Sequence, residues 1–333
     1  MQKAKGKKTI IVDESTIIVN NIQDNLKFDY RNDLISYNNL ELDTNELLNY
    51  DNYLTLSSKD DYNSSYTLRL MYVFKKLYSF LKTSNIYIQG GTSNSNDYKC
   101  QLRLENGDDK PIFYRGALMS TALYPIKCYA AYMSGNISIS NDEVIDTLVS
   151  LEGDASSLIN EINEYLNAIY TIGNYLPVPM LFDSERSGFT SNKASIDLTL
   201  SQIYNWYKRN ETNEEDPNPD KELYDLFKEG HSNKTTSTIR MTVKNTKQWL
   251  SNFNTWNDFI ESNYLQDFVI LISESNYGEP IMFFNNRTFT EYEFYNPTIL
   301  DNSIIESNFK QYFTIAKALI IKRNERLSSI NNI

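Results

Sequence analysis

Histidine is nearly absent from this chain, which has one, His231, among 333 residues. Histidine is the side chain that most often transfers protons near neutral pH, and it is the commonest metal ligand. Serine and cysteine triads, histidine-rich zinc sites and histidine-dependent nucleases therefore lack their essential part here. If the protein is an enzyme, carboxylates, arginine, lysine or tyrosine must carry the chemistry.

Cysteine and glycine-rich phosphate loops are also scarce. Cys100 and Cys128 are the two cysteines, too few for a disulfide framework or a cysteine metal cluster. We expect two buried thiols and no metal. Neither the glycine-lysine loop of nucleoside triphosphatases nor the glycine fingerprint of dinucleotide-binding folds occurs in the sequence. The leading prediction is accordingly a protein without a cofactor.

Long apolar runs and excess positive charge are missing as well. No run approaches the roughly 20 residues that cross a bilayer, and we expect no secretion signal. The net charge of −11 disfavours contact with nucleic-acid phosphates. We expect a cytoplasmic protein that binds neither membranes nor, directly, nucleic acids. Another protein is the expected partner.

The apolar and charged residues that are present predict a globular α+β fold. Hydrophobic residues make up 41% of the chain and charged residues 23%, as in folded domains. Apolar residues recur with helical spacing, and we expect a helix-dominated single domain over 1–333, with an exposed acidic loop at 210–220. The clearest helical patterns lie at 68–81, 158–169, 196–207 and 304–326.

Two small antiparallel β-hairpins complete the expected fold. Apolar and polar residues alternate over 98–104, and a turn separates this segment from 111–116. The second hairpin is expected to pair 279–284 with 289–295. The aromatic residues near 249–260 have two interpretations, a stacking surface for bases or a helical core. The core is favoured because few lysines or arginines accompany them.

The segment 170–209 is the most distinctive in composition. It combines a Gly173-Asn174 helix stop, Pro177 and Pro179, an isolated Arg186 and a helix led by Asp197. Loops of this kind hold either a shaped site or a rigid joint.

Arg186 and Asp197 lead to two interpretations of that segment. Arg186 either presents its guanidinium to a carboxylate or phosphate ligand, or forms a buried ion pair with Asp197 that pins the loop to the helix. The joint is favoured because structural ion pairs outnumber functional ones. We group four supporting residues with this pair, Thr171, Asn174, Asp267 and Arg323.

An ordered set of sequence blocks resembles a family of uncharacterised bacterial proteins that share a domain of unknown function. The blocks span most of the chain and read FDYRND, SYTLRL, LYSFL, YTIGNYLPVP, Asp183-x-x-Arg186, IDLTLSQI, WNDFIESNYLQDFV and KRNERL. The family commonly has Asn at Asp183 and a charged pair at Ser195-Ile196. The resemblance implies a shared fold and a shared element around 170–209, and it implies no activity.

A second arrangement is similar to the motif order of ADP-ribosyltransferases. Arg115 ends a predicted strand, Thr190-Ser191 follow later, and Glu291 and Glu293 form a Glu-x-Glu. In that family the arginine holds the pyrophosphate of NAD, the hydroxyl organises the nicotinamide side, and the second glutamate stabilises an oxocarbenium ion. The alternative is that Arg115 and Glu293 are strand residues that face solvent or each other.

The expected function is therefore binding rather than catalysis. A chain from an AT-rich genome without metabolic motifs is typical of bacterial conflict systems. We expect an accessory or effector component of a phage-defence or toxin–antitoxin type system that acts through protein–protein interaction. The alternative is an NAD-dependent ADP-ribosyltransferase-like enzyme that uses Arg115, Ser191 and Glu293.

Overall fold

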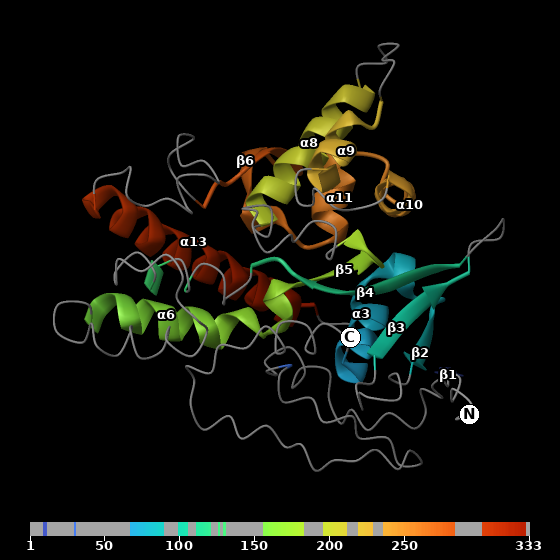
Figure 1. The fold of residues 1–333 in the computed structure, drawn as a ribbon, viewed down its shortest axis with the longest axis horizontal. Coiled ribbons are helices and arrows are strands. Elements are labelled where there is room, and N and C mark those ends of the chain that lie inside the picture. The colour runs from blue at the N-terminus through green and yellow to red at the C-terminus, as the bar shows by residue number, and fades with distance from the viewer. Residues whose placement is uncertain are drawn as a thin grey trace, which may run out of the picture.

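The computed structural model is α+β and dominated by helices, as the sequence predicts (Figure 1). It describes residues 9–11, 30, 67–89, 99–105, 111–120, 126, 129–130, 156–182, 196–211, 219–228, 236–283 and 302–330. The α-helices are α3 (Leu68–Leu77), α6 (Ser156–Ile169), α8 (Ile196–Glu211), α9 (Lys221–Lys228), α10 (Thr236–Leu250), α11 (Trp256–Ser262) and α13 (Asn302–Ser328). Three short 3-10 helices are η3 (Ser79–Leu81), η4 (Ile172–Asn174) and η6 (Gln266–Phe268).

Five strands form an antiparallel sheet in sequence order. They are β1 (Thr9–Ile11), β2 (Asn85–Gln89), β3 (Lys99–Leu104), β4 (Ile112–Leu118) and β5 (Tyr175–Pro179). The predicted first hairpin is present as β3 and β4, with Leu102 opposite Tyr114. Cys100, Leu102 and Leu104 are buried, as their alternation indicates. The hairpin is part of a larger sheet because β2 and β5 extend it on either side.

Strand β5 corrects the expectation of a proline-stiffened loop. All five of its residues are buried, and Pro177 lies opposite Gly116 of β4. Met180 N–H donates to Phe113 O at 2.7 Å. Because N–H groups alternate in direction along a strand, Pro177 and Pro179 occupy positions that face away from β4. Two prolines therefore fit into this edge strand without breaking its ladder.

A second sheet holds β6 (Val269–Ser273) and β7 (Asn276–Pro280), joined by a two-residue turn. The segment 279–284, expected as one strand of the second hairpin, overlaps β7 only at Glu279 and Pro280, where Pro280 lies opposite Val269, and residues 281–283 are not in a strand. The expected partner strand at 289–295 lies outside the described residues. Two irregularities in register interrupt the ladder between β6 and β7.

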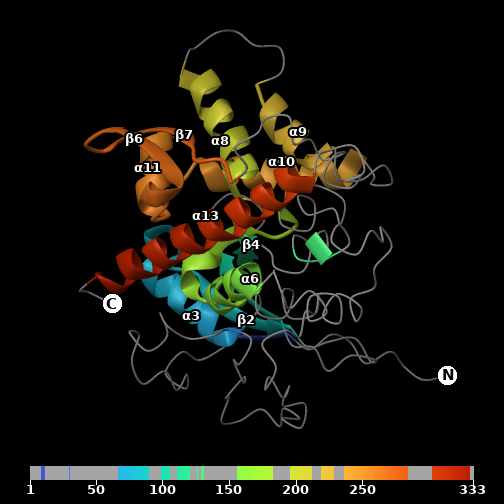
Figure 2. The same ribbon diagram turned by 90° about the vertical axis from the view of Figure 1, so that its left-hand side faces the viewer.

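Helix α13, with 27 residues, lies between α6 and the group of helices α8 to α11 (Figure 1; Figure 2). It lies along α6 in both views, with α8, α9, α10 and α11 on its other side (Figure 1; Figure 2). Helix α3 packs on the sheet formed by β2, β3 and β4. The aromatic residues of α10 and α11 are core residues, since Trp249, Trp256 and Phe259 are all buried and in ring contact.

Helix boundaries differ from the predicted ones mainly at the ends. The α6 helix ends at Ile169 and gives way to η4, so it stops before the predicted Gly173-Asn174. Thr67 is the N-cap of α3, because its hydroxyl accepts a hydrogen bond from Leu70 N at 3.2 Å. Of the predicted loop 210–220, residues 212–218 lie outside the described part. Asp220 is held in place by Trp206 and Lys247.

We predict that Gly173→Ala destabilises the protein by about 2–3 kcal/mol, because α13 crosses η4 at this glycine. A Cβ here would collide with the Ile320 carbonyl oxygen and lie 2.7 Å from the Asn324 side chain. Gly278→Ala is the matched control. Its Cβ would meet the movable end of Ile272, with Cδ1 at 3.2 Å, so the expected change is below about 1 kcal/mol. Urea unfolding measures both, and equal effects would contradict the close crossing.

Candidate functional site

The predicted site residues do not all lie together in the structure. Thr171, Asn174 and Arg323 come together where α6 ends, β5 begins and α13 crosses. We call this cluster the joint. Asp267 lies next to it, in a pocket beside the β6–β7 hairpin, and pairs with Arg326 rather than Arg323.

Asn174 closes the joint on the sheet side. Its side-chain oxygen accepts from Ser120 N at 2.8 Å, and its Nδ2 donates to Ser120 O at 2.7 Å. The same Nδ2 donates to Ile169 O at 2.8 Å, at the last residue of α6. The buried amide thus satisfies three backbone groups of two segments.

Thr171 and Asn324 connect the joint to α13. Thr171 Oγ1 donates to Ala168 O at 2.6 Å and accepts from Asn324 Nδ2 at 2.6 Å. The other end of the Asn324 amide accepts a hydrogen bond from Gly173 N. One amide therefore fixes both sides of the turn between α6 and η4.

Arg323 is the centre of the joint. Its residue is 0% exposed, yet no described carboxylate forms an ion pair with it. Nη1 lies 2.9 Å from both Gly173 O and Tyr175 O and 3.3 Å from Ile172 O. Nη2 donates to Tyr78 Oη at 2.6 Å and to Asn263 O at 3.0 Å, which Nε also approaches at 3.3 Å. The five N–H groups of the guanidinium thus face five oxygen atoms from three segments of chain.

Oxygen dipoles take the place of a carboxylate around this charge. Burial lowers the pKa of Arg323 from its ordinary value, and the contact with Tyr78 partly offsets this. Asn263 is the C-cap of α11, and carbonyl oxygens at a helix C-terminus carry partial negative charge. Burial raises the pKa of the Tyr78 hydroxyl, although the nearby Arg323 opposes the rise. The phenol therefore stays neutral near pH 7.

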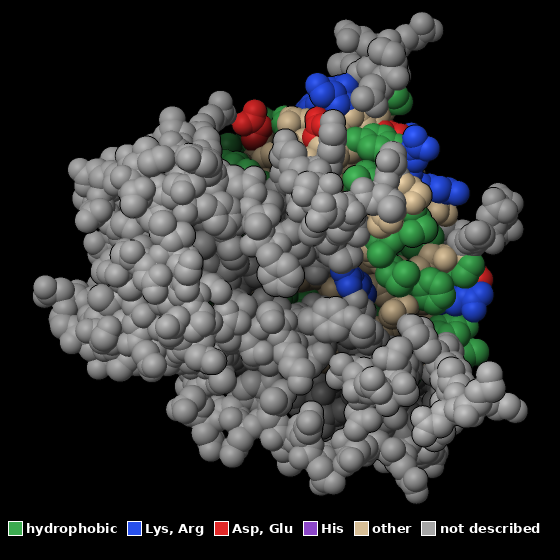
Figure 3. Space-filling model, in the orientation of Figure 1, with side chains coloured by type: hydrophobic (Ala, Val, Ile, Leu, Met, Phe, Trp, Pro, Cys, Tyr) green, Lys and Arg blue, Asp and Glu red, His purple; other side chains and the backbone are tan. Residues whose placement is uncertain are grey.

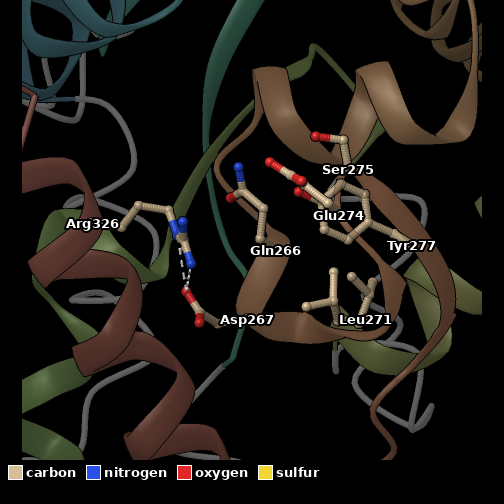
Figure 4. A pocket seen from close by; sticks show the side chains of 8 residues that line it. Gln266, Asp267, Leu271, Glu274, Ser275, Tyr277 and Arg326 are labelled. Atoms are coloured by element: carbon tan, nitrogen blue, oxygen red, sulfur yellow. Dashed lines mark hydrogen bonds and ion pairs between the residues drawn. The ribbon is translucent and has the colours of Figure 1, made fainter.

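The pocket beside the joint is open and has a volume of about 480 Å³. Figure 4 shows Arg326 reaching toward Asp267 across it. Both Nε and Nη2 of Arg326 bind Asp267 Oδ2, at 3.0 and 2.9 Å. The residues lining the pocket are Gln266, Asp267, Val269, Leu271, Glu274, Ser275, Tyr277 and Arg326.

Aliphatic and acidic groups share the pocket wall. Leu271 and Tyr277 are opposite each other in the hairpin, and Glu274 lies at its turn (Figure 4). The Tyr277 hydroxyl donates to Glu261 Oε1 at 3.3 Å. Partial burial and the Glu261 carboxylate raise the pKa of Tyr277. The pocket therefore suits a ligand with a positive charge and an apolar stem better than an anion.

The remaining predicted residues lie elsewhere or outside the described part. Asp197 is buried on α8, where its Oδ2 accepts from Phe283 N at 2.8 Å. Arg115 is 6% exposed in β4, opposite Val178, so it does not face solvent. Arg186, Ser191, Glu291 and Glu293 are not among the described residues. Both the ion pair with Asp197 and the transferase arrangement stay predictions.

Two general features of the described residues bear on function. Within them, no group of three or more histidine, cysteine or acidic side chains is arranged to hold a metal ion. None of the described helices is long and apolar enough to span a membrane. Comparison of the chain with protein-family models, curated proteins and solved structures gave no match.

Sequence reasoning missed Tyr78, Asn263 and Arg326. Tyr78 and Asn263 act through a hydroxyl and a backbone carbonyl, and neither has a sequence signal for binding an arginine. Arg326 does have a sequence signal, because it follows Arg323 by three residues and residues spaced i, i+3 are neighbours on a helix surface. That spacing places Arg323 and Arg326 near each other without saying which of them is buried.

We predict that Arg323→Met destabilises the protein by about 3–5 kcal/mol, because it leaves buried oxygen atoms without donors. Arg326→Met removes the same charge from the same helix, at a side chain that is 38% exposed. Its expected effect is below about 1 kcal/mol. Urea unfolding at pH 7 compares the two variants. Similar losses of stability in both would show that the joint is not anchored by Arg323.

Proposed function

We propose that this protein works by binding another protein, and that the β6–β7 hairpin is the contact surface. The observation that carries the proposal is a run of three exposed aliphatic residues on one strand. Ile270, Leu271 and Ile272 are 54%, 63% and 64% exposed. Adjacent exposed aliphatic residues of this size are a mark of interaction sites, whereas scattered single ones are normal.

Both faces of the hairpin take part in this apolar surface. Side chains alternate along a strand, so Ile270 and Ile272 lie on the face opposite Leu271. The Ile272 side chain lies over Gly278, where a Cβ would be 3.3 Å from its Cγ1. Leu271 lines the pocket. A partner can therefore cover the strand from one face and enter the pocket from the other.

The hairpin is held firmly at its base. Trp256 Nε1 donates to Gly278 O at 3.1 Å, and Asn257 Oδ1 accepts from Tyr277 N at 3.0 Å. Ile281 N donates to Phe268 O at 2.9 Å where the hairpin returns. A surface that is ordered before binding loses less conformational entropy on association. These contacts support an interaction role for the exposed strand rather than a frayed end.

The cellular setting of this binding is proposed from the sequence. An accessory or effector role in a bacterial phage-defence or toxin–antitoxin type system is supported by the base composition of an AT-rich genome and by the lack of catalytic motifs. The resemblance to uncharacterised bacterial proteins is compatible with that setting. The exposed strand supports a protein–protein interaction. It does not distinguish between a phage-defence and a toxin–antitoxin type system.

The binding role predicts a partner that depends on the exposed strand. In affinity capture from a bacterial lysate, the wild-type protein should recover one protein in stoichiometric amount. Ile270→Ser with Ile272→Ser should lose it, because burying two isoleucines contributes about 3 kcal/mol, or about 100-fold in Kd.

Met180→Ser with Met241→Ser is the matched control, since both methionines are exposed and lie outside the hairpin. It should recover the partner as the wild type does. Equal recovery by all three proteins would place the contact elsewhere. Recovery of no protein, with the purified chain a stable and inert monomer, would contradict the interaction role.

A further inference from the structure

The unit that carries the hairpin has charge of only one sign. Residues 256–283 contain five acidic residues and neither lysine nor arginine. Glu261, Glu274 and Glu279 are exposed, so their charge faces solvent around the hairpin. The five are Asp258, Glu261, Asp267, Glu274 and Glu279.

The helices α8, α9 and α10 differ from this unit in their charge. There Lys208 pairs with Glu211 at 3.0 Å and Lys247 pairs with Asp220 at 3.1 Å. Figure 3 shows basic and acidic side chains intermixed over this upper part of the molecule. The excess of negative charge around the hairpin is therefore a local feature and not a uniform property of the described surface.

Within the pocket, one acidic group is neutralised and another is not. Arg326 offsets the charge of Asp267 through its two hydrogen bonds. Glu274 forms no ion pair with any described residue, and it lines the same pocket as Leu271. The exposed strand thus adjoins a pocket with net negative charge and an aliphatic wall.

We propose that the partner segment is basic and aliphatic. Resting on the proposed function, this assigns a lysine or arginine side chain to the pocket, with its charged head at Glu274. The stem of that side chain packs along Leu271 and Tyr277, as long basic side chains do on apolar surfaces. Neighbouring aliphatic residues of the partner cover Ile270 and Ile272.

Charge disfavours a second copy of this chain as the occupant. A twofold contact through the hairpin would place the acidic unit opposite itself. Like charges facing each other across an interface oppose association and increase the selectivity for an oppositely charged partner. The chain also has a net charge of −11, which adds repulsion at long range.

Three short labelled peptides test this assignment by fluorescence anisotropy. In the first, lysine and arginine alternate with leucine and isoleucine; in the second, glutamate and aspartate replace the basic residues. The third keeps the basic residues and has serine at every aliphatic position. We expect the first to bind best, with affinity falling between about 0.05 M and about 0.3 M sodium chloride.

Glu274→Lys should weaken binding of the first peptide about fivefold or more. Glu211→Lys changes the net charge equally at the C-terminal end of α8, outside the pocket, and should leave affinity within about twofold. Leu271→Ser should also weaken binding. Near-ultraviolet circular dichroism checks that each variant keeps the wild-type fold.

Three results would contradict the proposal that the partner segment is basic. They are equal binding of the acidic peptide, equal effects of Glu274→Lys and Glu211→Lys, and no binding of the first peptide to the wild type. If Leu271→Ser alone weakens binding, the apolar surface stands and the charge assignment fails. Self-association of the wild type by light scattering, lost in Ile272→Ser, would make a second copy the occupant.

Discussion

A buried guanidinium that pairs with no carboxylate among the described residues lies where α3, η4 with β5, α11 and α13 meet. Arg323 binds the hydroxyl of Tyr78, the carbonyl of Asn263 and three carbonyls from Ile172 to Tyr175. Removing a charge from water costs free energy unless hydrogen bonds replace its hydration. Here all five N–H groups find oxygen atoms, so the segments that supply those atoms are held at fixed distances from one another. The remaining described layers are arranged around this point.

The same helix connects the joint to the proposed binding surface. Arg323 points into the joint, and three residues later Arg326 reaches Asp267 in the pocket. Asn263, which Arg323 holds, ends the helix that precedes η6 and the hairpin. Lys317, farther back on α13, pairs with Glu161 and Glu164 of α6. Helix α13 therefore contacts the start of β5, α6 and the base of the β6–β7 hairpin. These contacts hold the exposed strand in a fixed position relative to the rest of the described fold.

Sequence patterns predicted those elements whose signal is local. The helical spacing in α13 and the alternation in β3 appear in the structure near the expected positions. Strand β5 was missed because its five residues are all buried and two are prolines, which leaves no alternation to detect. The run Val269–Ile272 is continuous and apolar, a pattern typical of a buried strand, yet most of it is exposed.

The candidate site was predictable only in part, because its geometry depends on long-range contacts. Thr171, Asn174 and Arg323 lie together in the structure, whereas Asp267 lies with Arg326 in the pocket next to them and Asp197, on α8, contacts Phe283. Which of two neighbouring arginines is buried depends on carbonyl oxygens that distant segments supply, and backbone carbonyls leave no mark in the sequence. The proposed contact surface was missed for the related reason that exposure is a property of the assembled fold.

A double-mutant cycle between Arg323 and Tyr78 tests the central claim most directly. The cycle compares unfolding free energies of the wild type, Arg323→Met, Tyr78→Phe and the double variant at pH 7. If the guanidinium binds the Tyr78 hydroxyl as the 2.6 Å contact indicates, the coupling free energy should be about 1–2 kcal/mol. Additive effects, with a coupling below about 0.3 kcal/mol, would contradict a joint organised around Arg323.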